Sequence, residues 1–166
     1  MTESGGGDAE DVEAVTSAVL TASRLLVAVA ARSLAAAEER VTLPQFRMLV
    51  VLAGHAETKL VTLAELLAVN PSTAMRMVDR LAAAGLVSRE VNPESRREVM
   101  LRLTAAGRQI VDRVTAYRRR EIAAIVARMP ADQRTGLVTA LRAFTDAGGE
   151  LPAADAVRDA APLGWA

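Results

Sequence analysis

The spacing of apolar residues changes sharply on either side of Gly85. Before it, apolar residues recur every three or four positions, which is the period of one face of a helix. After it, every second residue from Val99 to Leu103 is a branched apolar one, as in a half-buried strand. Turn-forming residues at 92–95 separate this strand from a candidate partner strand over 87–91. The sequence therefore predicts a β-hairpin directly after a helical region.

Capping residues mark where the two helices before this hairpin begin. Thr62 is followed three residues later by Glu65, the spacing of a capping box, so a short helix is expected to start there. Asn70 is a good N-cap and Pro71 suits the first helical position, which predicts a second helix from Pro71 to about residue 84. Two helices joined by a tight turn and followed by a hairpin form the layout of a winged helix-turn-helix, whose second helix enters the DNA major groove.

Longer helical patterns flank this region on both sides. Thr42 and Gln45 form another capping-box spacing before a helix that ends at Gly54, and Thr104 caps a long helix that Pro130 ends. The chain is thus expected to be mainly α with a small β-hairpin wing. Its predicted divisions are a disordered N-terminus over 1–10, a long helix over 11–40, the winged helix-turn-helix over 41–103, further helices over 104–147 and a weakly ordered tail over 148–166.

Several classes of chemistry are excluded by residue types that the sequence lacks. There is no cysteine, which excludes disulfides, thiolate metal sites and cysteine nucleophiles. The sole histidine, His55, cannot form a histidine metal cluster, and no acidic cluster lies beside it in the sequence. No pairing of nucleophile and base and no glycine-rich phosphate loop is present. We therefore expect no enzyme activity, no cofactor and no metal.

The predicted location is the cytoplasm, with no membrane association. The opening residues lack the basic start and apolar run of a secretory signal. The apolar stretch from Leu25 to Ala31 stops at Arg32, short of the roughly 20 residues that span a bilayer.

The distribution of charge favours a nucleic-acid partner only locally. The net charge of the whole chain is zero, which argues against a nucleic-acid partner. Residues 70–102, however, contain six arginines against four acidic residues, a net charge of +2. Arginine is also the side chain best suited to bidentate contacts with guanine or phosphate.

The candidate DNA contacts lie on the helix after Asn70 and on the hairpin. On the helix, the apolar residues predicted to face inward are Met75, Val78, Leu81 and Ala82. Arg76 is expected to read a base directly, while Arg80 could instead pair with Asp79 or with the wing. The arginines at the hairpin tip could enter the minor groove or simply keep the tip soluble. The full set of candidate DNA-binding residues is Ser72, Thr73, Arg76, Arg80, Arg89, Arg96 and Arg97.

The order and spacing of these motifs resemble the MarR family of bacterial regulators. The resemblance runs from about Val41 to Gly107 and rests on the segments LPQFRML (43–49), TLAELL (62–67), NPSTAMRMVDRL (70–81), GLV (85–87), NPESRR (92–97) and LTAAG (103–107). It implies a homodimer whose N- and C-terminal helices interlock as dimerisation helices. It also implies a transcriptional repressor that binds double-stranded DNA at a pseudopalindromic operator. A small phenolic or apolar anionic effector would release it from that DNA.

Two wing residues depart from the family pattern. The family usually has aspartates where this chain has Asn92 and Ser95, and the second aspartate normally orients the arginine that matches Arg97. Together with the neutral net charge, this departure keeps one alternative open, a winged-helix protein-interaction module without DNA binding.

Overall fold

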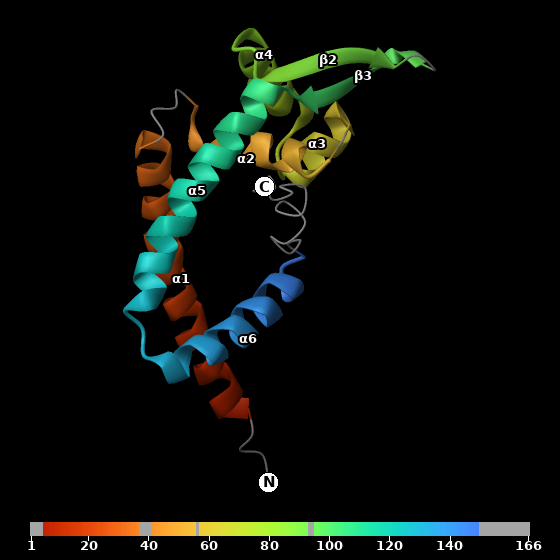
Figure 1. Ribbon diagram of the computed structural model, residues 1–166. Helices are drawn as coiled ribbons and strands as arrows, with labels where there is room; N and C mark the ends of the chain where they lie inside the picture. The colour runs from red at the N-terminus through yellow and green to blue at the C-terminus, as the bar shows by residue number, and fades with distance from the viewer. Residues whose placement is uncertain (1–4, 37–40, 56, 93–94, 150–166) are drawn as a thin grey trace, which may run out of the picture.

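The protein has a compact head from which two long helices extend, as Figure 1 shows. The computed structural model describes residues 5–36, 41–55, 57–92 and 95–149, with side chains over 9–36, 41–55, 57–90 and 99–149. The elements in chain order are α1 (Gly5–Ala36), α2 (Leu43–Ala53), β1 (Thr58–Lys59), α3 (Leu60–Leu66), α4 (Pro71–Ala83), β2 (Val87–Asn92), β3 (Ser95–Leu103), α5 (Ala105–Ala127) and α6 (Ala131–Ala147). The predicted fold class, mainly α with a small antiparallel wing, is confirmed.

The sheet of the head has three strands in the order β1-β3-β2, all antiparallel. β2 and β3 form the predicted hairpin, in register from Val87 opposite Leu103 to Val91 opposite Val99, with an irregularity between Val91 and Asn92. The sequence prediction missed β1, whose Thr58 lies opposite Leu101. A strand of two residues is too short to show an alternating pattern, so only its pairing with β3 defines it.

The start of α3 corrects a sequence prediction. The helix begins at Leu60 rather than after Thr62, and its N-cap is Lys59, whose side chain makes no capping hydrogen bond. The reason is that β1 feeds directly into the helix. Pairing with β3 holds Lys59 in an extended conformation (φ −76°, ψ 151°), which is the conformation that an N-cap residue requires.

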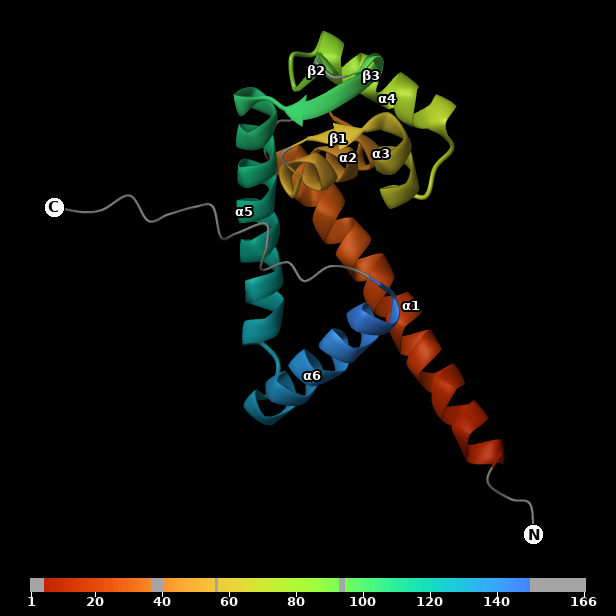
Figure 2. The ribbon, with the colours of Figure 1, turned by 90° about the vertical axis from the view of Figure 1, so that its right-hand side faces the viewer.

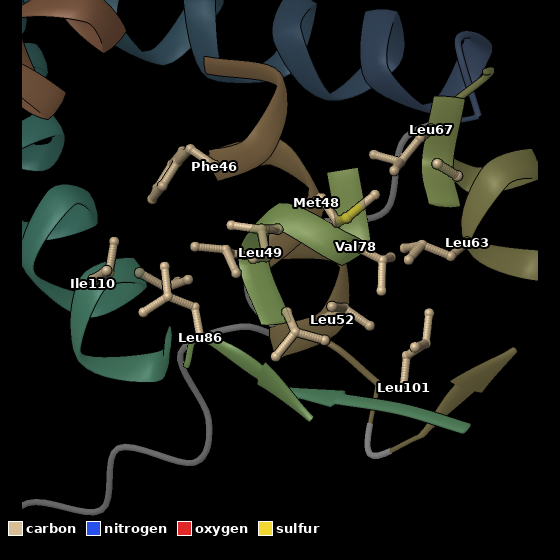
Figure 3. Close-up of a cluster of buried hydrophobic side chains, with 14 of the residues drawn as sticks. Phe46, Met48, Leu49, Leu52, Leu63, Leu67, Val78, Leu86, Leu101 and Ile110 are labelled. Carbon is tan, nitrogen blue, oxygen red and sulfur yellow. The ribbon is translucent and has the colours of Figure 1, made fainter. Parts of the chain in front are cut away.

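A single hydrophobic core fills the head and joins it to the long helices. In Figure 3 the buried side chains of α2 meet those of α3, α4, β3 and α5. The core is built around α2, where Met48, Leu49 and Leu52 are completely buried. This helix starts at the predicted capping box, in which Thr42 Oγ1 accepts from Gln45 N and Gln45 Oε1 accepts from Thr42 N.

Helix α1 is longer than predicted and largely uncovered. It begins at Gly5 rather than near Asp11, because extending an existing helix needs no new nucleus even though glycine is a poor helix former. Its stretch Ala9–Ala36 is long and apolar enough to cross a membrane by length and composition, which the prediction from Leu25–Ala31 had underestimated. Its last turns, however, pack into the head, where Leu34 is buried in the core. Its first half leaves an apolar face exposed.

Helices α5 and α6 meet at a corner held by one arginine. Arg134 on α6 donates to the carbonyl oxygen of Ala127 at 2.9 Å and to that of Met129 at 2.8 Å. Figures 1 and 2 both show α6 leaving the end of α5 that is remote from the head. Within α6 no residue is buried, and three large apolar side chains, Val138, Leu141 and Phe144, are each about half exposed.

Candidate nucleic-acid interface

The start of α4 is held by the residue that the sequence singled out. Asn70 Oδ1 accepts from the backbone N–H of Thr73 at 3.1 Å and from Ser72 Oγ at 3.0 Å. Pro71 occupies the first helical position, where its missing N–H is not needed. The predicted N-cap is thus confirmed. Its bonds keep the side chain of Ser72 at the solvent-facing start of the helix.

The buried face of α4 differs from the predicted one, because Ala74 is buried in place of Met75 and Ala82 is only half-buried. Ala74, Val78 and Leu81 are buried, whereas Met75 is 42% exposed. The prediction that Met75 faces inward is therefore wrong. Ala74 lies 100° away around the helix and takes the buried position, because its small side chain lets α4 pack closely against the core.

The other α4 positions place polar side chains in solvent. Ser72, Arg76 and Arg80 are exposed, and Thr73 is half-buried. Arg76 Nη2 lies 3.5 Å from Thr73 Oγ1, one turn earlier, at the limit of a hydrogen bond. In the described part of the chain, no hydrogen bond or ion pair involves the Arg80 guanidinium. Two cationic groups are thereby presented on the face of α4 that is turned away from the core.

Ion pairs join the hairpin to α4 and to the residue before β1, and also link its two strands. Arg89 on β2 pairs with Asp79 on α4, so Asp79 is not the partner of Arg80 that the sequence allowed. Arg102 on β3 pairs with Glu57 and, at 3.5 Å, with Glu90. The Arg89 guanidinium is thus paired with a carboxylate of α4 in the structure.

The hairpin tip carries the remaining predicted contacts. Arg96 and Arg97 lie on β3 next to its first residue, Ser95, which pairs with Asn92 across the hairpin. Their side chains fall outside the described residues. In Figure 1 the hairpin projects sideways from the same end of the head, at the top of the picture, as α4.

A second feature lies between α1 and α5. An open groove of about 500 Å³ there is lined by Arg32, Ser33, Ala35, Ala36, Tyr117, Arg120 and Glu121. Arg32 pairs with Glu121 at 3.2 Å, and the Arg120 guanidinium stacks 4.3 Å from the centre of the Tyr117 ring. This stacking contact could not be predicted from the run of three arginines at 118–120, because it depends on how Arg120 and Tyr117 are placed on α5.

Comparisons with known proteins agree on one family. The model of the MarR family matches residues 41–99. The structure is similar to that of RV1404 from Mycobacterium tuberculosis, with 52% sequence identity over 92% of this chain and 99% of that chain and a TM-score of 0.79. It is also similar in fold to a MarR family protein from Bacillus stearothermophilus, at 21% identity over 85% of this chain and 97% of that one, with a TM-score of 0.77.

A third similar structure contains a ligand. The PcaV transcriptional regulator from Streptomyces coelicolor, in complex with its natural ligand, is 27% identical over 66% of this chain and 78% of that one, with a TM-score of 0.51. A search of curated proteins found no match.

Proposed function

This chain belongs to the MarR family of DNA-binding transcriptional regulators, and we propose that it is a cytoplasmic, homodimeric repressor released from a pseudopalindromic operator by a small ligand. The observation that carries the proposal is the outward face of α4. This capped helix exposes Ser72, Arg76 and Arg80 beside a hairpin that projects from the same end of the head. A helix with this face fits the major groove of B-DNA.

The proposed role of each candidate DNA-binding residue follows from its position on α4 or on the hairpin. Arg76, with Ser72 and Thr73 near the start of α4, contacts base edges, because that end of a recognition helix reaches the groove floor. Arg80 binds phosphate. Arg96 and Arg97, near the hairpin tip, contact the minor groove or its phosphates. Arg89 holds the wing against Asp79 rather than contacting DNA itself.

A selection from random double-stranded DNA tests the proposal. The purified protein should enrich a pseudopalindrome whose half-sites are about 10 base pairs apart, one helical turn. Arg76→Ala should weaken specific binding by about 1–3 kcal/mol per half-site and relax the preference at one base pair. Arg97→Ala should weaken binding to every sequence and lower the slope of log K against log[salt] by about one.

Arg128→Ala serves as the matched control, since Arg128 is an exposed arginine at the end of α5 that is remote from α4. It should leave the binding unchanged. Enrichment of no sequence at any salt concentration would contradict the proposal and favour a protein-interaction module.

The ion pair between wing and recognition helix gives a further expected result. Asp79→Asn removes a negative charge from the outward face of α4 and leaves Arg89 without its partner. Non-specific DNA affinity should then rise, and its salt dependence should steepen by about one phosphate contact. Fluorescence anisotropy on a non-operator duplex over a range of salt concentrations measures both quantities. Arg89→Gln should lower the affinity, because Asp79 then faces DNA unpaired.

One result of this measurement would instead favour direct contact between Arg89 and DNA. If Asp79→Asn left non-specific binding and its salt slope unchanged, the pair would not set the charge of the DNA-facing surface. Thermal melting of both variants controls for folding, because an exposed ion pair of this kind contributes only about 0.2–1 kcal/mol to stability.

The effector part of the proposal is supported by the groove between α1 and α5. Its lining combines two guanidinium groups, a phenol ring and one carboxylate. Arg120 stacks on Tyr117, and a planar anion could use the same ring and cation. The bound natural ligand of PcaV belongs to that protein and supports only the general idea of ligand control here.

A further inference from the structure

Met75 is the one large apolar side chain that α4 exposes, all of this helix being described. It is 42% exposed, although Val78 and Leu81 of the same helix are buried. Ser72 lies one turn before it and Asp79 one turn after it, and both are polar. An apolar side chain therefore stands within the polar face that carries Arg76.

The position of Met75 is set by the packing of its neighbour. Ala74 is completely buried, so the following residue is turned about 100° away from it, out of the core. Because Met75 lies in the first half of α4, it is on the part of a recognition helix that reaches base edges. The unbranched thioether can adjust its shape to the surface that it meets.

The chemistry of the major groove offers one kind of partner to such a side chain. Base edges there present hydrogen-bond donors, acceptors and the C5-methyl group of thymine. Methionine donates no hydrogen bond, and its sulfur is only a weak acceptor. We propose that Met75 contacts a thymine methyl in each half-site and so determines specificity at a base pair beside the one that Arg76 reads. This inference rests on the proposed DNA-binding function.

Replacing single thymines with deoxyuridine tests the contact, since deoxyuridine lacks only the methyl group. Each thymine of the selected operator is replaced in turn, symmetrically in both half-sites, and binding of the full-length dimer is measured by fluorescence anisotropy. At one position the wild-type affinity should fall about fourfold per half-site, which corresponds to the loss of one buried methyl group. Both half-sites together should give about 15-fold.

Substitutions at Met75 then separate this contact from a structural role. Met75→Leu keeps an apolar side chain and should remain sensitive to deoxyuridine at that position. Met75→Gln has nearly the same length but is polar, and it should bind the thymine and deoxyuridine operators equally. Met75→Gln should also shift the selected base towards adenine, which glutamine can bind through two hydrogen bonds.

Two results would overturn the inference, and they differ from one another. If the wild-type protein binds its operator specifically but no thymine shows a methyl effect that Met75→Gln abolishes, Met75 does not read thymine, and the proposed function stands. If selection enriches no DNA sequence, the function and this inference fall together. Thermal melting checks that each variant is folded, as expected for an exposed position.

Discussion

Gly107→Ala should unfold the junction between the wing and α5, lowering the free energy of unfolding by about 3 kcal/mol. A Cβ at this position would overlap the carbonyl oxygen of Leu86 and lie 2.7 Å from Leu103 Cδ1. The Leu86 oxygen cannot give way easily, because it accepts the backbone N–H of Thr104 at 3.1 Å. Thr104 is also the N-cap of α5, and its Oγ1 accepts from Gly107 N at 3.0 Å.

Close approach at this glycine is therefore what lets the long helix dock on the base of the hairpin. Urea denaturation followed by circular dichroism, at one fixed protein concentration, measures the loss of stability.

Gly136→Ala is the matched control for this substitution. Gly136 lies in α6, and no atom of the residues that the structure describes stands within 4 Å of the position that its Cβ would take. Alanine should therefore raise stability by about 0.5–1 kcal/mol, because glycine is the poorer helix former. If Gly107→Ala proved as harmless as Gly136→Ala, the contact between α5 and Leu86 would have to be looser than the structure shows.

Replacing Leu141 and Phe144 together with aspartate should convert the proposed dimer into monomers. With Val138, these residues recur every third position along α6, and the first half of α1 exposes a second apolar face at Val12 and Val15. Two buried aspartates in an apolar interface would lack partners, which is strongly unfavourable. Sedimentation equilibrium should show the mass falling from twice the 17.5 kDa of one chain to that of one chain.

Loss of the dimer should also remove most of the operator affinity. Two linked half-site contacts raise each other's effective concentration, so separating them should cost at least 100-fold in affinity without any change on α4. Thr139→Asp is the control, because Thr139 lies on the opposite side of α6 from Leu141. A double variant that kept both its dimeric mass and its operator affinity would place the dimer interface elsewhere on the chain.

The helix starts could be predicted from the sequence because caps are local. Thr42, Asn70 and Thr104 each bond to a backbone N–H three residues further on, so a short window of sequence contains the whole interaction. The hairpin could be predicted for a similar reason, since turn residues and alternation lie within one stretch. These features together were sufficient to indicate the fold class and to select α4 as the candidate recognition helix.

Other features depend on residues that are far apart in the chain. The two-residue strand β1 exists only through its pairing with β3, and that pairing moved the start of α3 to Leu60. Arg89 and Asp79 meet because the hairpin lies beside α4, and this pairing could not be predicted from residues ten positions apart on different elements.

The sequence by itself determined where the helices of the head begin, apart from α3, and that α4 presents arginines to solvent. The tertiary structure alone decided which of two adjacent apolar residues, Ala74 or Met75, is buried. The physical reason is that hydrophobicity favours burial of either residue. The packing of α4 turns Ala74 towards the core together with Val78 and Leu81, and Met75 is left on the surface that faces DNA in our proposal.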